Sequence, residues 1–577
     1  MFLGNLMKIA LFFTIWIIVL FYGCDSASSE ENNFAKNITP LSIDFKTTQA
    51  LNNKAAYITS QCYTKTTDEN NVSHNPCFSC HINSKEPNYI DDADLQTIYD
   101  MREYTKVNRF TNLFKDRTEL VEAMSDEETL QYVREDNYKD DLNNLRLRKK
   151  LTSLPVEWDV NGDGVWNGYI PDCNFKFDET GFDRYEDNTY SGWRAFAYYP
   201  FLGTFWPTNG SFDDVIIRLP QEFREDNNSV FSLEVYRLNL AIVESMIKEK
   251  DVEIDMVDEN LYGVDLNKDG LLNTTTLIKY EWIPPLYDSG TKKITNFSMS
   301  YIGRAKELLK SNEHLIAPGL YPKGTEFLHS VRYIDVVNDE VTMAPRMKEL
   351  RYAKKDSWNS YAQVQNASMA EIMEKDLFPD RLRTILGDTE KGLKTGLGWT
   401  YQGFIEDENG ELRPQNYEET LYCIGCHSGI GAIADSTFVF QRKLEYASKQ
   451  NGWYHWSQDI NGLKNMREPL TKTGLYEYSR YLEKNSAGDE FRDNEEIIEN
   501  YFDNGVLKTE KIGELHSDVS KLLLPSVKRA LILNKAYKVI VEEQSFIYGR
   551  DAHVKPVQNV YKEVKAGSET GNSELYN

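Results

Sequence analysis

The chain has 577 residues and a formal net charge of -25, from 90 acidic and 65 basic side chains. Its 41% hydrophobic content, with 12% aromatic residues, is enough for packed cores in about two to four domains. A negative field of this size repels nucleic acid, and no basic stretch with interleaved aromatic residues offsets it. We therefore expect no nucleic-acid partner, and cationic proteins are the partners that this charge favours.

The first 23 residues are typical of an export signal. Lys8 precedes the apolar run IALFFTIWIIVLFYG, which ends directly before Cys24. Gly23-Cys24 resembles the end of a bacterial lipobox, which implies cleavage here and a lipid-modified Cys24. An uncleaved membrane anchor and a signal peptide cut nearby are the alternatives. Under each, the chain is exported; the lipobox resemblance favours lipid anchoring to a bacterial membrane, in the periplasm or at the cell surface.

The rest of the chain divides into five regions by composition. The first is a polar tether, and the second and fourth each contain a cysteine-rich motif. The third is rich in aromatic residues, and the fifth is helical and ends in a tail that we expect to be disordered. Their predicted bounds are 24–44, 45–151, 152–290, 291–468 and 469–577.

Helical patterns dominate the predicted elements. DADLQTIYDMREY and MSDEETLQYVRE have helical periodicity, and Ser125 and Glu128 form a capping box before the second of them. SVKRALILNKAYKVIVEEQSF carries a continuous apolar stripe, whereas DVIIRLP and FSLEVYRL are typical of strands. We therefore predict a mainly α fold with irregular, loop-rich parts and minor β structure.

Two short stretches, NPCFSCH and YCIGCHSG, each contain the pattern C-x-x-C-H. With seven cysteines and eight histidines in the chain, two such matches are not expected by chance. In this pattern the two thiols form thioethers to the porphyrin vinyl groups, and the histidine sits under the iron. The matching residues are Cys77, Cys80, His81, Cys423, Cys426 and His427.

At these two pentads, which cover little of its length, the chain resembles c-type cytochromes. The resemblance implies two covalently bound haem c groups, His81 and His427 as proximal iron ligands, and electron transfer to and from redox partner proteins. A zinc site and a C-x-x-C redox pair are the other interpretations of these residues. The two segments differ outside the motif and are far apart in sequence, which favours one mosaic di-haem cytochrome c body over duplicated modules.

The chemistry at each iron depends on its sixth ligand. A second His or a Met gives an electron carrier, and His329, then His455, lead the candidates, with Met343 and Met347 as thioether alternatives. An open position permits peroxide or oxygen chemistry. Bacterial di-haem peroxidases and haem-dependent rubber oxygenases are similar in carrying two such motifs in one exported chain, so an oxidoreductase with one open iron is the alternative function.

Two Asp-rich loops, DVNGDGVWN and DLNKDGLLN, predict calcium sites. Each places oxygen-bearing side chains at positions one, three and five and a glycine at six, as in the first half of an EF-hand loop. Both lack the glutamate at position twelve, where Ile170 and Thr276 stand, and Asp172 is a candidate substitute in the first loop. Asx turns that bind nothing are the alternative. The predicted ligands are Asp159, Asn161, Asp163, Asp265, Asn267 and Asp269.

Two further cysteines, Cys62 and Cys173, belong to neither motif. Export places them in an oxidising compartment, where leftover thiols often pair. A Cys62–Cys173 disulfide is therefore one expectation, and two buried free thiols are the other.

Overall fold

The computed structural model describes residues 38–68, 70–85, 92–204, 206–458, 462–485 and 493–576. The predicted signal peptide and the lipidation site Cys24 therefore lie outside the described residues. The chain has two compact units, Met1–Pro40 and Leu41–Asn577. Among the described residues, no helix combines the length and the apolar character that crossing a membrane requires.

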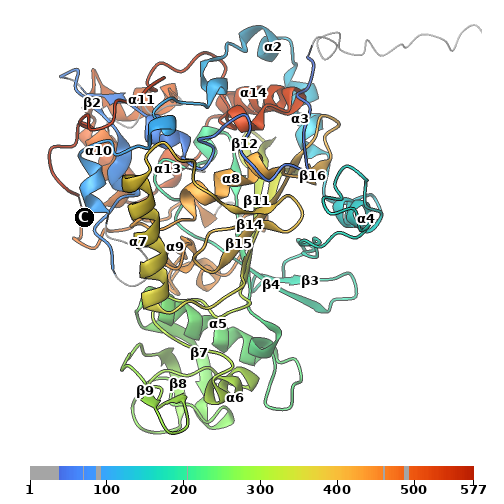
Figure 1. The fold of residues 1–577 in the computed structure, drawn as a ribbon, viewed down its shortest axis with the longest axis vertical. Helices are drawn as coiled ribbons and strands as arrows, with labels where there is room; N and C mark the ends of the chain where they lie inside the picture. The colour runs from blue at the N-terminus through green and yellow to red at the C-terminus, as the bar shows by residue number, and fades with distance from the viewer. Residues whose placement is uncertain are drawn as a thin grey trace, which may run out of the picture. The chain divides into compact units, whose positions relative to one another are not determined.

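Ten strands form one antiparallel sheet in the middle of the body formed by Leu41–Asn577 (Figure 1). Their order is β13-β14-β15-β12-β11-β6-β4-β3, with β16 paired to β15 and β5 paired to β11. The prediction of a mainly α fold is therefore wrong. The strands are β3 (Phe182–Arg184), β4 (Tyr190–Phe196), β5 (Phe212–Asp213), β6 (Val215–Arg218), β11 (Glu326–Val337), β12 (Glu340–Lys355), β13 (Leu386–Asp388), β14 (Gly392–Lys394), β15 (Trp399–Glu406) and β16 (Leu412–Pro414).

The longest strands, β11 and β12, explain the error. They pair along nearly their whole lengths, yet β12 reads EVTMAPRMKELRYAKK, with few of the apolar residues that a buried strand usually has. Lys348, Glu349 and Lys355 are nevertheless buried. Their charges are accommodated by partners from distant parts of the chain, and the local sequence pattern does not reveal such partners.

The two faces of the sheet support different cores, because successive side chains of a strand point to opposite faces. Leu328 and Phe404 belong to an aromatic-rich cluster on one face. Phe327 and Tyr401 belong to the main core on the other face, together with residues of helix α8 (Tyr417–Cys426). The second C-x-x-C-H motif, which ends α8, is therefore on the main-core side of the sheet.

Several local predictions are confirmed. Helix α3 (Asp126–Arg134) begins at the predicted capping box of Ser125 and Glu128. Helix α14 (Val527–Glu543) follows the predicted apolar stripe, and DVIIRLP contains strand β6. The other described helices are α2 (Thr118–Glu122), α4 (Arg146–Thr152), α6 (Arg304–Ser311), α7 (Tyr361–Leu377), α9 (Val439–Arg442), α10 (Glu477–Asn485), α11 (Glu495–Tyr501), α12 (Thr509–Leu515) and α13 (Ser520–Leu523).

Two other local predictions are wrong. FSLEVYRL is not a strand but the start of helix α5 (Leu233–Lys248), whose N-cap is Ser232. DADLQTIYDMREY does not form an α-helix, and its first residues form only the 3-10 turn Ala93–Gln96. Both segments have ambiguous short patterns, so contacts with the rest of the fold decide their conformation.

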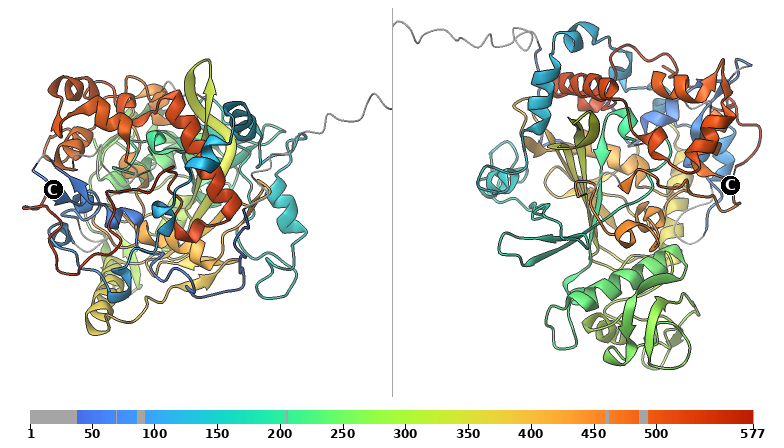
Figure 2. Two further views of the ribbon diagram at one scale, coloured as in Figure 1. Left: turned by 90° about the horizontal axis from the view of Figure 1, so that it is seen from above. Right: turned by 180° about the vertical axis from the view of Figure 1, so that it is seen from behind.

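Helices gather at one end of the body, and a smaller α/β part lies at the other. Figure 1 places α2, α3 and α14 together, and α5 and α6 with short strands at the opposite end, and the rear view in Figure 2 agrees. The short strands form two-stranded sheets: β1 (Thr66–Thr67) with β2 (Ser73–His74), β7 (Val252–Asp258) with β8 (Thr274–Ile278), β9 (Leu286–Asp288) with β10 (Lys293–Thr295), and β17 (Phe502–Asp503) with β18 (Val506–Leu507).

The C-terminal tail, which the sequence predicts to be disordered, instead packs over the first motif. Asn75 N donates to Thr570 O at 2.8 Å, and Asn572 Nδ2 donates to Asn75 O at 3.0 Å. The rings of Phe78 and Tyr576 lie edge to face with centroids 5.1 Å apart. Backbone pairing and single anchoring side chains order this segment, and neither leaves an apolar pattern in the sequence.

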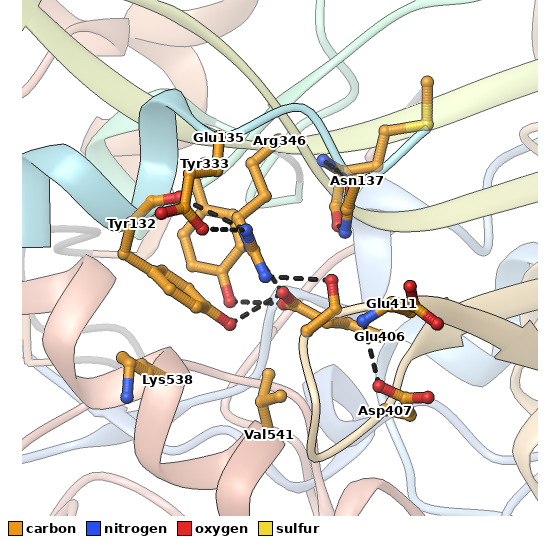
Figure 3. A network of polar contacts seen from close by, with 12 residues as sticks. Tyr132, Glu135, Asn137, Tyr333, Arg346, Glu406, Asp407, Glu411, Lys538 and Val541 are labelled. Atoms are coloured by element: carbon orange, nitrogen blue, oxygen red, sulfur yellow. Dashed lines mark hydrogen bonds and ion pairs between the residues drawn. The ribbon is translucent and has the colours of Figure 1, made fainter. Parts of the chain in front are cut away.

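A buried ion pair ties α3 to the sheet (Figure 3). Arg346 Nε donates to Glu406 Oε1 at 2.6 Å, and the hydroxyls of Tyr132 and Tyr333 each donate to the same carboxylate at 2.6 Å. Glu406 is fully buried. The carboxylate therefore joins α3, β11, β12 and β15 at a single point.

Candidate functional site

The two C-x-x-C-H segments lie against each other although they are far apart in the sequence. Ala432 N donates to Cys80 O at 2.9 Å, and Gly431 N donates to Asp92 Oδ1 at 3.1 Å. The hydroxyl of Ser84 also donates to Gly431 O. The chain directly after each motif thus contacts the other motif's segment.

The first motif forms a tight turn. Pro76–Ser79 is a 3-10 helix with a proline in its first turn, where proline is tolerated because that position needs no N–H donor. The backbone N–H groups of Cys80 and His81 both donate to Cys77 O, at 3.1 and 2.9 Å. One turn therefore carries the two thiols and the imidazole.

The His81 ring is held through Nδ1, which lies 2.6 Å from Asp92 Oδ2. Within the part of the chain that the structure describes, His81 Nε2 makes no hydrogen bond. Metal-binding histidines almost always donate their second ring N–H to a carboxylate or carbonyl, which fixes the tautomer and the ring orientation. The Asp92 carboxylate holds the His81 ring in the same way.

The second motif forms the last turn of α8. The helix begins at a capping box of Asn416 and Glu419, and His427 N donates to Cys423 O at 2.9 Å. His427 Nδ1 lies 2.9 Å from Ser436 O, and the described residues give Nε2 no hydrogen bond. Burial lowers the pKa of His427 to about 4, so the imidazole is neutral at pH 7, as an iron ligand must be.

Ser436 lies in a strained turn. Two backbone hydrogen bonds of 2.9 and 3.0 Å close Ala434–Thr437, and Asp435 and Ser436 have φ of 49° and 61°, a region that costs energy for residues other than glycine. Asp435 forms a buried ion pair with Lys355, and Tyr401 Oη donates to Ser436 O at 3.0 Å. These contacts hold the strained carbonyl where it meets the imidazole of the second motif.

The Tyr401 ring also stacks on His427, with centroids 4.6 Å apart and planes inclined by 25°. Tyr401 stands on β15, so the central sheet sets the position of the imidazole plane. The side chain of Tyr401 therefore contacts both the His427 ring and the Ser436 carbonyl that accepts from that ring.

All four motif thiols are in surroundings that disfavour the thiolate. Burial is the first cause of a raised pKa at each of them: Cys77, Cys80, Cys423 and Cys426. Zinc binding and disulfide exchange both require the thiolate, whereas the sulfur of a thioether carries no charge. Among the described residues, no group of three or more His, Cys, Asp and Glu side chains is arranged to hold a metal ion. With these raised pKa values, all four motif thiols are protonated and neutral at pH 7.

Cys62 and Cys173 are both free thiols, so the structure does not contain the predicted disulfide. Cys173 is fully buried in the aromatic-rich cluster on one face of the sheet. Cys62 lies on the motif side, close enough to Cys77, Cys80 and Cys426 to raise the pKa of each.

His329, the first candidate for a distal ligand, lies near the second motif. It stands on β11 opposite Arg351 of β12, and its Nε2 lies 3.6 Å from Asp213 Oδ2. Burial, together with the nearby Arg351 and His427, lowers the pKa of His329 to about 4. His329 is thus a neutral, partly buried imidazole in the neighbourhood of the second motif.

The other distal candidates are less well placed. Both ring nitrogens of His455 have partners, Nε2 with Asp214 Oδ2 at 2.7 Å and Nδ1 with Ser457 Oγ at 2.6 Å. Met347 is fully buried in the aromatic-rich cluster, on the face of the sheet away from α8, and Met343 is partly buried against the main core.

The predicted calcium ligands lie in two tight loops. In each loop the first aspartate accepts the N–H of the glycine at position six, and the asparagine at position three contacts the aspartate at position five. The distances are 2.9 Å for Gly164 N to Asp159 Oδ2, 2.9 Å for Gly270 N to Asp265 Oδ2, 3.0 Å for Asn161 Nδ2 to Asp163 Oδ2, and 3.3 Å for Asn267 Nδ2 to Asp269 Oδ2.

Asp172 does not complete the first loop. Its carboxylate accepts from Arg218 Nη1 at 2.6 Å and from Trp193 Nε1 at 2.9 Å. The suggestion that Asp172 replaces the glutamate at position twelve is therefore not supported by its contacts.

A cavity of about 360 Å³ lies elsewhere in the body, beside α5 and β7. Its lining includes Arg194, Glu244, Lys443 and Trp453, and no residue of either motif. This cavity is therefore separate from the two C-x-x-C-H motifs.

Sequence reasoning missed the residues that orient the two imidazoles. Asp92 lies in a stretch whose pattern predicts a helix, and Ser436 contributes only a carbonyl, which every residue has. Tyr401 lies in a strand that was not predicted. No local signal distinguishes these three positions.

Comparison with known proteins identifies the protein family of the chain. A family model described as a "-like lipoprotein" matches residues 46–518. An "Uncharacterized lipoprotein" of Aquifex aeolicus (strain VF5) is 31% identical over 541 residues, which cover 86% of this chain and 85% of the relative. No solved structure matches.

These matches make the protein an exported lipoprotein, which a lipid anchor holds at a membrane. The chain belongs to this lipoprotein family, whose model matches residues 46–518. Lipidation at Cys24 stays a prediction.

Proposed function

We propose that the protein is a di-haem c-type cytochrome that transfers electrons at a bacterial membrane surface. One feature shared by both motifs carries the proposal: Nδ1 of each histidine lies against an acceptor oxygen, from Asp92 or from Ser436, and Nε2 is left for the iron. When bound, the haem supplies an iron that changes oxidation state by one electron. Cys77, Cys80 and His81 would hold one haem, and Cys423, Cys426 and His427 the other.

The contact between the motifs supports electron transfer within one body. The backbone of Cys80 bonds directly to that of Ala432, so groups attached to the two segments would be neighbours. The lipid anchor would keep such a carrier at the membrane, and the net charge of -25 favours cationic redox partners.

Optical spectra of the full chain, expressed with a haem-attachment system, test the proposal. We expect haem c spectra in the oxidised and reduced protein, two haems per chain, and no change on adding carbon monoxide, because two six-coordinate irons are closed to it. A chain without haem would refute the proposal. Carbon monoxide binding at one haem would favour the alternative, a peroxidase- or oxygenase-like oxidoreductase with one open iron.

We propose further that His329 is the distal ligand of the second haem. His329→Ala should then convert one of the two haems to a high-spin form that binds carbon monoxide, while the other stays low-spin. His314→Ala is the control, since His314 packs edge-on against Phe223, away from the motifs, and should leave the spectrum unchanged. An unaltered spectrum in His329→Ala would remove this residue as a ligand.

Asp92→Asn should raise the midpoint potential of one haem by on the order of tens of millivolts. A carboxylate that accepts from Nδ1 makes the imidazole a stronger electron donor and stabilises the oxidised iron, and an amide does so less. A spectroelectrochemical titration measures the shift, with the exposed neighbour Asp94→Asn as the control. An unchanged or lower potential would show that Asp92 does not tune the iron.

A further inference from the structure

Three oxygen atoms meet where the first Asp-rich loop touches the hairpin between β13 and β14. Asn167 Nδ2 donates to all three: Asp163 Oδ2 at 3.2 Å, Val165 O at 3.0 Å and Glu390 Oε1 at 2.7 Å. The partial positive charge of the amide NH₂ is thus surrounded by oxygens at loop positions five and seven and by a carboxylate from outside the loop. Oxygens in this arrangement suit a hard cation.

Glu390 brings an unused ligand atom to this point. Its side chain is fully buried, and Oε1 accepts both the backbone N–H and the side-chain amide of Asn167, each at 2.7 Å. Oε2 is buried and has no hydrogen-bond partner within the described ranges. Buried carboxylate oxygens are rarely left without a donor or a cation, so this atom points to a ligand that the side chains do not supply.

The hairpin and the loop are fixed against each other. A side chain at Gly168 would meet Glu390 O at 2.0 Å, so only glycine allows this approach. Gln402 Nε2 donates to Glu390 O at 2.7 Å, and Gln402 Oε1 accepts the N–H of Tyr169 at 2.8 Å. The position of the Glu390 carboxylate is therefore a property of the fold and does not depend on a chance contact.

We propose that this site binds Ca²⁺ and that Glu390 supplies the carboxylate that the loop lacks at position twelve. Ca²⁺ takes about six to eight oxygen ligands, and the EF-hand pattern uses side chains at positions one, three and five and a carbonyl at seven. Binding displaces the Asn167 amide and draws the loop oxygens inward, since the side chains are not now gathered around one ion. The ligands would be Asp159, Asn161, Asp163, Val165 O and Glu390.

The second Asp-rich loop provides the comparison. The buried carboxylate beside it, Glu259, accepts backbone N–H groups at both oxygens: Oε1 from Leu266 at 2.6 Å and Oε2 from Asn273 at 3.1 Å. Lys268 Nζ donates to Asp265 O at 2.8 Å, which adds a positive charge to the loop. In the second loop the buried oxygen that has no partner among the described residues is Oδ1 of the loop's own Asp265, whereas the carboxylate from outside that loop is fully satisfied. Of the two loops, the first is therefore the one that an unsatisfied outside carboxylate completes, and this role does not depend on haem.

Isothermal titration of the EGTA-treated full chain with calcium chloride tests the site. We expect calcium binding by the native protein, and apparent affinity weaker by at least about tenfold in Glu390→Gln and in Asp163→Asn, because each loses one charged ligand. Asp269→Asn in the second loop is the matched control and should bind as the native chain does. At one calcium concentration, the midpoint of thermal unfolding should rise by less in Glu390→Gln than in the native and control proteins.

Three results would overturn the proposal: no calcium binding at millimolar concentration, native-like affinity in both Glu390→Gln and Asp163→Asn, or loss of binding in Asp269→Asn alone. If Glu390→Gln does not fold, Asp163→Asn decides the question, since Asp163 is exposed and its replacement leaves the core intact. A haem-free preparation that still binds calcium would separate this site from the proposed electron transfer.

Discussion

Replacing both cysteines of the first motif should lower the haem content from two groups per chain to one. Cys77→Ala with Cys80→Ala removes both thioethers, and the imidazole of His81 alone does not hold a porphyrin covalently. The second haem should remain, because α8 and the carbonyl of Ser436 position its histidine independently of the first turn. Pyridine haemochrome absorbance per chain, together with haem staining after denaturing electrophoresis, measures the stoichiometry.

Cys62→Ala is the matched control for this experiment. Cys62 is near enough to the motif thiols to affect their pKa values, yet no second cysteine and histidine follow it at the required spacing. It should leave two haems per chain. Loss of haem in Cys62→Ala, or two haems retained in the first-motif variant, would contradict the assignment of the attachment sites.

The reciprocal variant, Cys423→Ala with Cys426→Ala, should also retain one haem per chain. The haem that remains in this variant should have a different midpoint potential from the haem that remains in the first-motif variant, because a carboxylate orients His81 whereas a carbonyl orients His427. If either double variant loses both haems, the two segments depend on each other for attachment and are not separate sites.

The sequence predicts those parts of the molecule whose pattern lies within a few consecutive residues. Each C-x-x-C-H motif needs only five consecutive residues, and α3 and α14 have their caps and apolar faces within their own lengths. β12 is different, because Lys348, Glu349 and Lys355 are buried there by contacts from elsewhere. Lys355, for example, pairs with Asp435, 80 positions away, so its charge suggests exposure until the fold is known.

The groups that complete the candidate sites differ in their distance along the chain, since Asp92 is 11 positions from His81 and Ser436 is 9 positions from His427. Neither group is marked in the sequence, because Asp92 is one of several neighbouring aspartates and Ser436 contributes only a backbone carbonyl, which any residue would supply. Glu390 is 223 positions from the loop that it meets. The half-loop pattern lacks a carboxylate at position twelve, and the close approach of the β13–β14 hairpin to Gly168 brings Glu390 to this loop.

The largest loss of stability is expected at Glu406. Glu406→Ala leaves the guanidinium of Arg346 buried without its carboxylate, and breaking a buried ion pair on one side costs about 3–5 kcal/mol. Tyr132 and Tyr333 lose their acceptor as well, so α3 should detach more easily from the sheet. Urea-induced unfolding followed by far-ultraviolet circular dichroism measures the effect as a lower midpoint.

Asp407→Asn is the control for Glu406→Ala, because it removes a neighbouring negative charge but leaves the buried ion pair intact. Asp407 accepts backbone N–H groups from Asn409 and Glu411, and an amide oxygen replaces this function at a cost of about 1 kcal/mol or less. The double variant Arg346→Met with Glu406→Leu should recover much of the loss, because apolar replacement of a whole buried pair is often neutral. If Glu406→Ala is as stable as the native chain, solvent reaches Arg346. If the double variant is no more stable than Glu406→Ala, the loss of stability comes from the two tyrosine hydroxyls, which neither replacement provides with an acceptor.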